Sequence, residues 1–578
     1  MWGGAQVASS GVLSGERTIG ALWIDAVLLV GVFGMAYGLY QEAHNWHTVV
    51  PRHAVEISLS PWYLPWYTFQ SLSRGLIAYF ISLLFTLGYA YWAAKDHRAE
   101  RVLIPLLDIL QSIPVLGFLP GLVIALVALF PKTNTGLELA AILMIFTGQV
   151  WNMTFSLYRS LRTVPREQQE AATIFGFSLW QRVTKVELPF ATLGLVWNSM
   201  MSMAGGWFYL MIIEAFQLQN QDFRLPGLGS YMSVACDAEN NWAKLWGILA
   251  MIFMIVVLDQ LLWRPLVAWA QKFRVEDGAQ EVTHSWFLDF LRRSRLAAGV
   301  TRACARSFER SKNRERKPVV PAVTKTIRQV NGFLSLLPLV VLIGVMCWGT
   351  FELFSMLRHV SKGEWVAIAK GTGLTSVRVV TAIILGTLWT VPVGLAIGLS
   401  PKLSRLLQPI VQIAASFPAP MLFPVVVGVM SLVGINLGFS SIILLLLSTQ
   451  WYILFNVIAG AMTIPADLRE AARTYGVKGM RIFRQLYLPA IFPYLVTGWV
   501  TSMGGAWNAS IVSEYMKIHG QVIHTTGLGA LMSQAVDADK LNVLAASVVV
   551  MSLVVVGINR LLWKRLYHLA ETTYCIDK

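Results

Sequence analysis

The chain has 578 residues, of which 56% are hydrophobic and only 13% are charged, and its mean hydropathy is +0.58. A composition this apolar excludes an ordinary soluble globular protein and predicts a protein that crosses a bilayer many times. The formal net charge of +15 comes from Lys and Arg residues that lie mainly between the apolar runs, which is typical of cytoplasmic loops. We therefore interpret this charge as a signal of membrane topology and expect no nucleic-acid partner.

The first 70 residues are expected to form one helix and an external segment. Residues 21–40 are apolar and long enough to cross a hydrocarbon core of about 30 Å, and no signal-peptide cleavage site follows them. The external segment contains His44, His47 and His53, but no carboxylate cluster supports a metal site, so we favour a solvated loop. The four cysteines are scattered, so neither a disulfide frame nor a metal site is expected.

Apolar runs recur along the whole chain and predict an all-α polytopic membrane protein. About twelve spans are expected, near 21–40, 71–94, 115–130, 137–158, 191–213, 243–263, 333–356, 374–399, 420–434, 439–460, 491–513 and 541–562. They form two sets of six, and an even number of spans gives both sets the same orientation. The sets are therefore predicted to be parallel six-helix repeats, related by an axis along the membrane normal. If the N-terminus is cytoplasmic, most Lys and Arg residues fall on the cytoplasmic side.

The two sets are copies of each other in sequence. At an offset of 300 residues they match without a gap from Glu170 to Trp263, and upstream the offset becomes 304, which pairs Arg74 with Arg378. The predicted parts are an N-terminal helix and external segment (1–70), the first repeat (71–268), a basic cytoplasmic linker (269–330), the first helix of the second half with an external segment (331–372), the second repeat (373–566) and a cytoplasmic tail (567–578). We interpret the linker as a solvated segment that touches anionic lipid, in preference to a specific regulatory site.

Each repeat contains a polar cassette, at residues 165–189 and 465–489. Each cassette opens with Pro followed by acidic residues, which favours a helix start. Gly176 and Gly476 permit a bend, after which we expect a second helix that Leu-Pro closes as the chain re-enters lipid. The residues shared by the cassettes are Glu170, Ala171, Ala172, Gly176, Leu188 and Pro189 in the first, and Glu470, Ala471, Ala472, Gly476, Leu488 and Pro489 in the second.

This pattern resembles the EAA loop of the permease subunits of binding-protein-dependent ABC importers, the type I importer family. The resemblance covers roughly residues 71–268 and 373–566. "DILQSIPVLGFLP" (108–120) and "GGAWNASIVSEY" (504–515) are similar to the branch that handles nitrate, sulfonate, taurine and bicarbonate, although the first half departs from it at "AGGWFYLMIIEAF" (204–216). The resemblance implies the type I ABC importer permease fold and a pore for a small anionic or polar solute.

The resemblance also implies partners. Two ATP-binding subunits would dock on the two cassettes, and a periplasmic or lipid-anchored solute-binding protein would deliver the solute. The chain has no G-x-x-x-x-G-K-[ST] stretch, so ATP and Mg are expected on the partner subunits and no cofactor or enzymatic activity in this chain. The expected location is a bacterial inner membrane, with both loops cytoplasmic.

Charged residues within spans mark candidate sites, because their burial in lipid is unfavourable. Glu214 and Glu514 are symmetry mates that could line the pore, but we prefer a structural bond to a helix end or to Arg74 and Arg378. Further candidates for the substrate path are Trp151, Asn152, Trp207, Trp451, Trp507, Asn508 and Ser510, and the tryptophans could equally be interfacial anchors. Candidates for the gate are Pro114, Pro120, Pro418 and Pro424, which could instead be packing kinks.

Two other classes of protein remain open. A secondary transporter with two six-helix halves, driven by an ion gradient, shares the parallel repeats but has no need of matched cassettes. A membrane scaffold whose basic linker binds a regulator is the second. An ATPase that follows the chain through detergent extraction would separate the importer from both.

Overall fold

A computed structural model describes most of the chain. The described residues are 15–47, 56–218, 221–273, 285–294, 336–518 and 521–573. His53, the side chains of His44 and His47, the start of the span expected at 333–356 and most of the basic linker lie outside them. The chain divides into two compact units. Unit 1 comprises residues 1–45, 165–196 and 257–331, and unit 2 comprises residues 46–164, 197–256 and 332–578.

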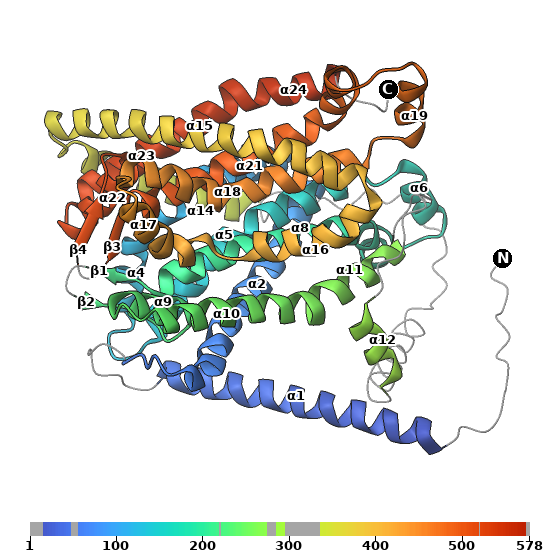
Figure 1. The fold of residues 1–578 in the computed structure, drawn as a ribbon, viewed down its shortest axis with the longest axis horizontal. Coiled ribbons are helices and arrows are strands. Elements are labelled where there is room, and N and C mark those ends of the chain that lie inside the picture. Colours follow the sequence, from blue (N-terminus) through green and yellow to red (C-terminus); the bar gives the residue numbers. More distant parts are fainter. Residues whose placement is uncertain are drawn as a thin grey trace. The chain divides into compact units, whose positions relative to one another are not determined.

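Long helices in matched pairs build unit 2 (Figure 1). Those of the first repeat are α2 (Leu64–Lys95), α5 (Thr135–Arg162), α8 (Leu188–Glu214), which enters the unit at Trp197, and α10 (Asn241–Leu258). Their counterparts are α15 (Lys362–Leu399), α18 (Leu437–Met462), α21 (Leu488–Ser513) and α23 (Leu541–Ile558), and α14 (Leu336–Leu357) precedes them. In the second repeat α18 packs between α15 and α21, and in the first α2 packs along α5.

All twelve predicted spans contain a helix, which agrees with the all-α prediction. Among the residues that the structure describes, six helices are long and apolar enough to cross a membrane, and a seventh qualifies if one bent pair is counted as a single span. Helices α8 and α21 have 27 and 26 residues, but Gly, Ser, Asn and Trp interrupt their apolar sequence. These small and polar residues suit helices that pack inside the bundle.

The spans expected at 115–130 and 420–434 correspond to helices too short to cross a bilayer alone. They are α4 (Leu119–Leu129) and α17 (Phe423–Leu432), about 16 and 15 Å long. Helices α3 (His97–Ser112) and α16 (Pro401–Ser416) precede them, and α16 meets the following helical segment at 80°. The break lies at Pro114 and Pro418, because the residue before a proline is driven out of the helical conformation.

Two short hairpins, which the sequence did not predict, follow α8 and α21. β1 (Gln217–Leu218) pairs antiparallel with β2 (Gln221–Asp222), and β3 (Tyr515–Ile518) pairs with β4 (Gln521–His524). Each hairpin leads into a short helix, α9 (Leu228–Asp237) or α22 (Leu528–Asp537). Within unit 2 the hairpins lie at one end, and α19 (Ala466–Thr474) lies at the other (Figure 1).

Unit 1 contains α1 (Gly15–His47) up to residue 45, the first cassette and the segments after α10. These segments include α11 (Arg264–Ala270) and α12 (Trp286–Arg293). The Ser294 hydroxyl at the end of α12 donates a hydrogen bond of 2.6 Å to Asp25 of α1. Trp286 donates from its indole nitrogen to Gln260, so α12 is fastened at both ends.

Candidate functional site

The two cassettes share a short helix, a bend at glycine and a second short helix. In the first, α6 (Arg166–Ile174) is followed by Gly176 at φ +62°, and then by α7 (Leu179–Arg182). In the second, α19 is followed by Gly476 at φ +67°, and then by α20 (Met480–Ile482). A positive φ is readily adopted by glycine and disfavoured for residues with a Cβ. The short helix and the bend at glycine are thus confirmed.

The prediction that Leu-Pro closes the second helix is wrong. Leu188 and Leu488 begin α8 and α21, and π turns at Val183–Glu187 and Phe483–Tyr487 join them to the cassette helices without a break. The Leu188 N–H donates to the Val183 carbonyl, five residues back, before Pro189 removes the next donor. The wider turn changes the hydrogen-bond register just where proline would otherwise obstruct it, so the helix continues.

Large apolar side chains are exposed on both cassettes, a feature that the sequence interpretation missed. Ile174, Phe175 and Trp180 are 83%, 74% and 68% exposed in the first cassette, and Tyr475 and Met480 are 85% and 63% exposed in the second. Glu170 and Glu470 are exposed beside them. An exposed apolar patch with a polar rim is typical of a protein-binding surface. The signal in the sequence was the aromatic residue directly before each bend glycine, Phe175 in the first cassette and Tyr475 in the second.

Glu214 belongs to a buried ionic cluster in the first repeat. Its carboxylate accepts hydrogen bonds of 2.8 Å from Arg74, from the Ser71 hydroxyl and from the Gly229 N–H. The other edge of the Arg74 guanidinium donates to both oxygens of Glu138, at 2.6 and 2.7 Å. The cluster ties α2, α5 and α8 to the N-terminus of α9, which is the structural role that we preferred for Glu214.

Glu514 has the corresponding place in the second repeat. It accepts 2.8 Å hydrogen bonds from Arg378 and Thr375, and one of 2.9 Å from the Gly529 N–H at the start of α22. Arg378 donates on its other side to the Thr525 hydroxyl at 3.0 Å. Gly438 stands 300 residues after Glu138, and a Cβ on it would lie 3.8 Å from the Arg378 guanidinium. The second cluster therefore has one carboxylate where the first has two.

The "GLG" repeated at 227 and 527 follows from these clusters. A Cβ on Gly227 or Gly527 would overlap the carboxylate of Glu214 or Glu514. The first glycine of each motif therefore gives the carboxylate its access to the N-terminal N–H groups of the next helix, where a negative charge is stabilised.

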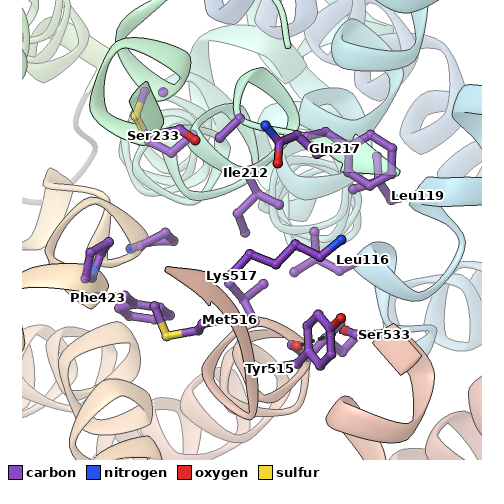
Figure 2. Close-up of a pocket in the computed structure, with 18 of the residues that line it drawn as sticks. Leu116, Leu119, Ile212, Gln217, Ser233, Phe423, Tyr515, Met516, Lys517 and Ser533 are labelled. Atoms are coloured by element: carbon purple, nitrogen blue, oxygen red, sulfur yellow. Dashed lines mark hydrogen bonds between the residues drawn. The ribbon is translucent and has the colours of Figure 1, made fainter. Parts of the chain in front are cut away.

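A cavity of about 1060 Å³ lies in unit 2 between residues of both repeats (Figure 2). Helices α9 and α22, strand β3 and the broken segments after Pro114 and Pro418 line it. We call it the hairpin cavity. Its charged lining residues are Asp237, Glu239, Lys517 and Asp537. Asp537 accepts hydrogen bonds from the Tyr515 hydroxyl and, at 3.1 Å, from Lys517. Burial, followed by the bond to Asp537, raises the pKa of Tyr515.

A second cavity of about 230 Å³ also lies in unit 2 between the repeats, and we call it the aromatic chamber. Its walls include Trp151, Trp451, Tyr209 and Tyr452, and none of the described residues that line it is charged. Asn508, also in the wall, accepts a 2.7 Å hydrogen bond from the Val115 N–H. This bond connects α21 of the second repeat to the broken segment of the first.

The structure separates the predicted path residues into two groups. Trp151, Asn152, Trp451 and Asn508 line the aromatic chamber. The predicted residues outside both linings are Trp207, Trp507, Ser510, Glu214 and Glu514, which are buried between helices. Gly75 makes room for the Trp207 ring, and the Ser510 hydroxyl donates to the Trp507 carbonyl.

The predicted gate residues lie around the two cavities. Pro120 and Pro424 line the hairpin cavity, Pro418 lines the aromatic chamber and Pro114 belongs to neither lining. Residues 417–419 border the chamber and residues 420, 421, 423 and 424 border the hairpin cavity, so one short segment touches both. In the described part of the chain, no three His, Cys, Asp or Glu side chains are grouped as a metal site.

Comparison with known proteins gives the family. The family model "Binding-protein-dependent transport system inner membrane component" matches twice, at residues 85–262 and 390–567. A putative ABC transporter permease protein of Methanocaldococcus jannaschii is 26% identical over 32% of this chain and 65% of its own length. A nitrate import permease protein of Synechocystis is 25% identical over 35% of the chain and 70% of its own length. A taurine transport system permease protein of Escherichia coli is 25% identical over 31% and 61%.

These matches span about two thirds of each relative's length and about one third of this chain. The family model, in contrast, accounts for more than half of the chain in two copies, and these copies coincide with the two repeats seen in the fold. The chain therefore belongs to the family of binding-protein-dependent transport system inner membrane components, as a fused double permease of the type I ABC importer class.

Proposed function

We propose that this chain forms the translocation pore of an ATP-driven importer. The duplicated cassette, with large apolar side chains exposed on both copies, is the observation that carries the proposal. Each cassette would dock one ATP-binding subunit on the cytoplasmic side, and ATP with Mg would be held by those subunits. A periplasmic or lipid-anchored binding protein would deliver the solute. The solute would be small and carry an anionic group, as for the relatives named for nitrate and taurine.

The second cassette supports a route by which docking would move the pore. From Met480 the chain runs through the π turn into α21, which extends for about 39 Å and would act as a lever. Asn508 on this helix borders the aromatic chamber, and Ile511 borders the hairpin cavity. A movement of α19 and α20 would therefore shift the walls of both cavities.

The segments at Pro114–Pro120 and Pro418–Pro424 would form the gate. The second of them touches both cavities, and the first donates the Val115 N–H to Asn508 of α21. Proline frees carbonyls that a regular helix would bond, and such irregular backbone is tolerated at membrane depth where it lines a cavity. The proposed lever and the proposed gate would thus be joined by the hydrogen bond between Val115 and Asn508.

Co-purification tests the proposal. The tagged chain, co-expressed with candidate ATP-binding subunits, should retain two copies of them through detergent extraction and size exclusion. Phe175→Ser with Tyr475→Ser should abolish this, because each change removes an exposed apolar anchor. Trp242→Ser, which removes a similarly exposed side chain (73%) from the start of α10, is the matched control and should retain the subunits.

One observation favours the ion-driven alternative, namely the buried Arg74–Glu138–Glu214 cluster, since intramembrane carboxylates also occur in proton relays. Reconstituted vesicles separate the two functions. Solute uptake that follows an imposed proton or sodium gradient without ATP-binding subunits would refute the importer. Uptake that requires ATP, the subunits and the binding protein would refute the alternative.

A further inference from the structure

The aromatic chamber has a composition that restricts which solute it suits. Seven aromatic side chains line it: Trp151, Phe208, Tyr209, Phe417, Trp451, Tyr452 and Phe455. Its polar groups are amides and hydroxyls, and none of the charged residues that the structure describes reaches its wall. The indole N–H of Trp151 has no hydrogen-bond partner among the described residues. Its volume of about 230 Å³ is the space of about eight water molecules, so the occupant is small.

Such a lining is unsuited to a bare anion. Aromatic faces carry negative electrostatic potential and attract ammonium and methylated ammonium groups, for which aromatic cages are a common binding site. An inorganic oxyanion leaving water needs charge-assisted donors, because the desolvation of an ion is otherwise strongly unfavourable. The chamber offers only neutral donors among its described lining residues, such as the Asn152 amide, and these are too weak to replace the water around a bare anion.

The hairpin cavity also favours cationic over anionic groups, but because of its charged residues. Three carboxylates line it, from Asp237, Glu239 and Asp537, against the single ammonium of Lys517, and Asp237 also forms a 3.5 Å ion pair with Arg224 outside the lining. Lys517 is itself held by Asp537 at 3.1 Å. Gln217 takes the place of Lys517 in the first repeat, and both project toward the middle of the cavity (Figure 2). A cleft lined mainly by one sign of charge concentrates solutes of the opposite sign.

From these two linings we propose that the solute carries a positively charged amine or methylated amine in addition to its anionic group, as a small organic zwitterion does. Bare inorganic oxyanions would be excluded. The inference rests on the proposed function for the assignment of the two cavities to the transport path. Within that path, the three carboxylates and the aromatic faces would favour the cationic end, and Lys517 would contact the anionic end.

Charged thiol reagents test the preference on the whole chain in lipid nanodiscs, with no partner subunit present. Ser233 and Ser533 are repeat mates in the hairpin cavity, and Ser448 lines the chamber. Each would be changed singly to Cys in a chain whose own four cysteines are Ser. Trimethylammonioethyl and sulfonatoethyl methanethiosulfonate are similar in size and opposite in charge. Their rates would be normalised to those with mercaptoethanol.

At all three positions we expect the cationic reagent to react about tenfold faster than the anionic one. Asp237→Asn with Asp537→Asn should reduce this ratio at Ser533→Cys, and Lys517→Gln should increase it. Tetramethylammonium chloride should slow modification of the Ser448→Cys chain, and sodium nitrate at the same concentration should not. Equal rates, faster reaction of the anionic reagent, stronger protection by nitrate, or a chamber cysteine that reacts with neither reagent would overturn the proposal.

These rates do not depend on ATP or on any partner. A cationic preference measured on a chain that fails to retain ATP-binding subunits would refute the importer and leave the charge preference standing. An anionic preference on a chain that retains those subunits would refute the zwitterion and leave the importer standing.

Discussion

Replacement of Arg74 by Leu should destabilise the protein more than replacement of its repeat mate Arg378. Arg74 donates three hydrogen bonds to two carboxylates, and the side chains of Glu138 and Glu214 are 4% and 0% exposed. Arg74→Leu leaves both carboxylates without this counter-charge. Removal of one member of a buried ion pair costs about 3–5 kcal/mol of folding free energy. Arg378 donates to a single carboxylate and is 12% exposed, so Arg378→Leu should cost about 1.5–3 kcal/mol.

The assay is the free energy of unfolding of the detergent-solubilised chain, from denaturation in mixed micelles. A double variant, Arg74→Leu with Glu138→Leu, provides the internal check, because it leaves one carboxylate that Ser71 and the Gly229 N–H still satisfy. It should recover part of the lost stability. The reasoning is refuted if Arg378→Leu costs as much as Arg74→Leu, or if the double variant is no more stable than the single one.

Three further outcomes follow from the same geometry. Gly476→Leu places a side chain at φ +67° in open space, so it should strain the bend by about 1–3 kcal/mol and reduce ATP-driven uptake by the assembled transporter. Gly557→Ala is also in open space but at an ordinary helical φ, so this control should leave uptake unchanged. Gly527→Ala brings a Cβ onto the Glu514 carboxylate and should lower the melting temperature of the purified chain, again with Gly557→Ala as the neutral reference. The folded state raises the pKa of Tyr515 above its unfolded value of 10.0, so the contribution of Tyr515 to stability is complete below about pH 10 and is lost as the pH rises further. Tyr515→Phe should therefore flatten the decline of the denaturation midpoint at alkaline pH. An unchanged slope would contradict the raised pKa of Tyr515.

Local patterns were sufficient to predict the cassettes but not their junction with the membrane helices. The acidic helix start and Gly176 determine the backbone within a few residues, so the helix and bend could be read directly. Leu188-Pro189 misled the interpretation because proline normally ends a helix, and a π turn can absorb it only through hydrogen bonds set by the surrounding turns. Periodicity alone carries no signal for such a turn.

The residues predicted for the substrate path show a different limit of prediction from sequence. Trp151 and Trp207 both stand within predicted spans, yet one lines the aromatic chamber and the other fills the space beside Gly75. Which side of a helix faces a cavity depends on the packing of distant helices, which composition does not contain. The pairing of Glu214 with Arg74, by contrast, was expected, because two opposite charges within apolar helices have few other partners.

The unequal ionic clusters illustrate what joining both repeats in one polypeptide permits. In a pore assembled from two identical chains, a substitution at the position of Glu138 would enter both sides at once, with its effect on folding doubled. Here the second side has Gly438 instead, and Arg378 is satisfied by a hydroxyl. Covalent fusion thus lets the first repeat keep both carboxylates of its ionic cluster while the second repeat accumulates substitutions, so each repeat can be altered by mutation on its own.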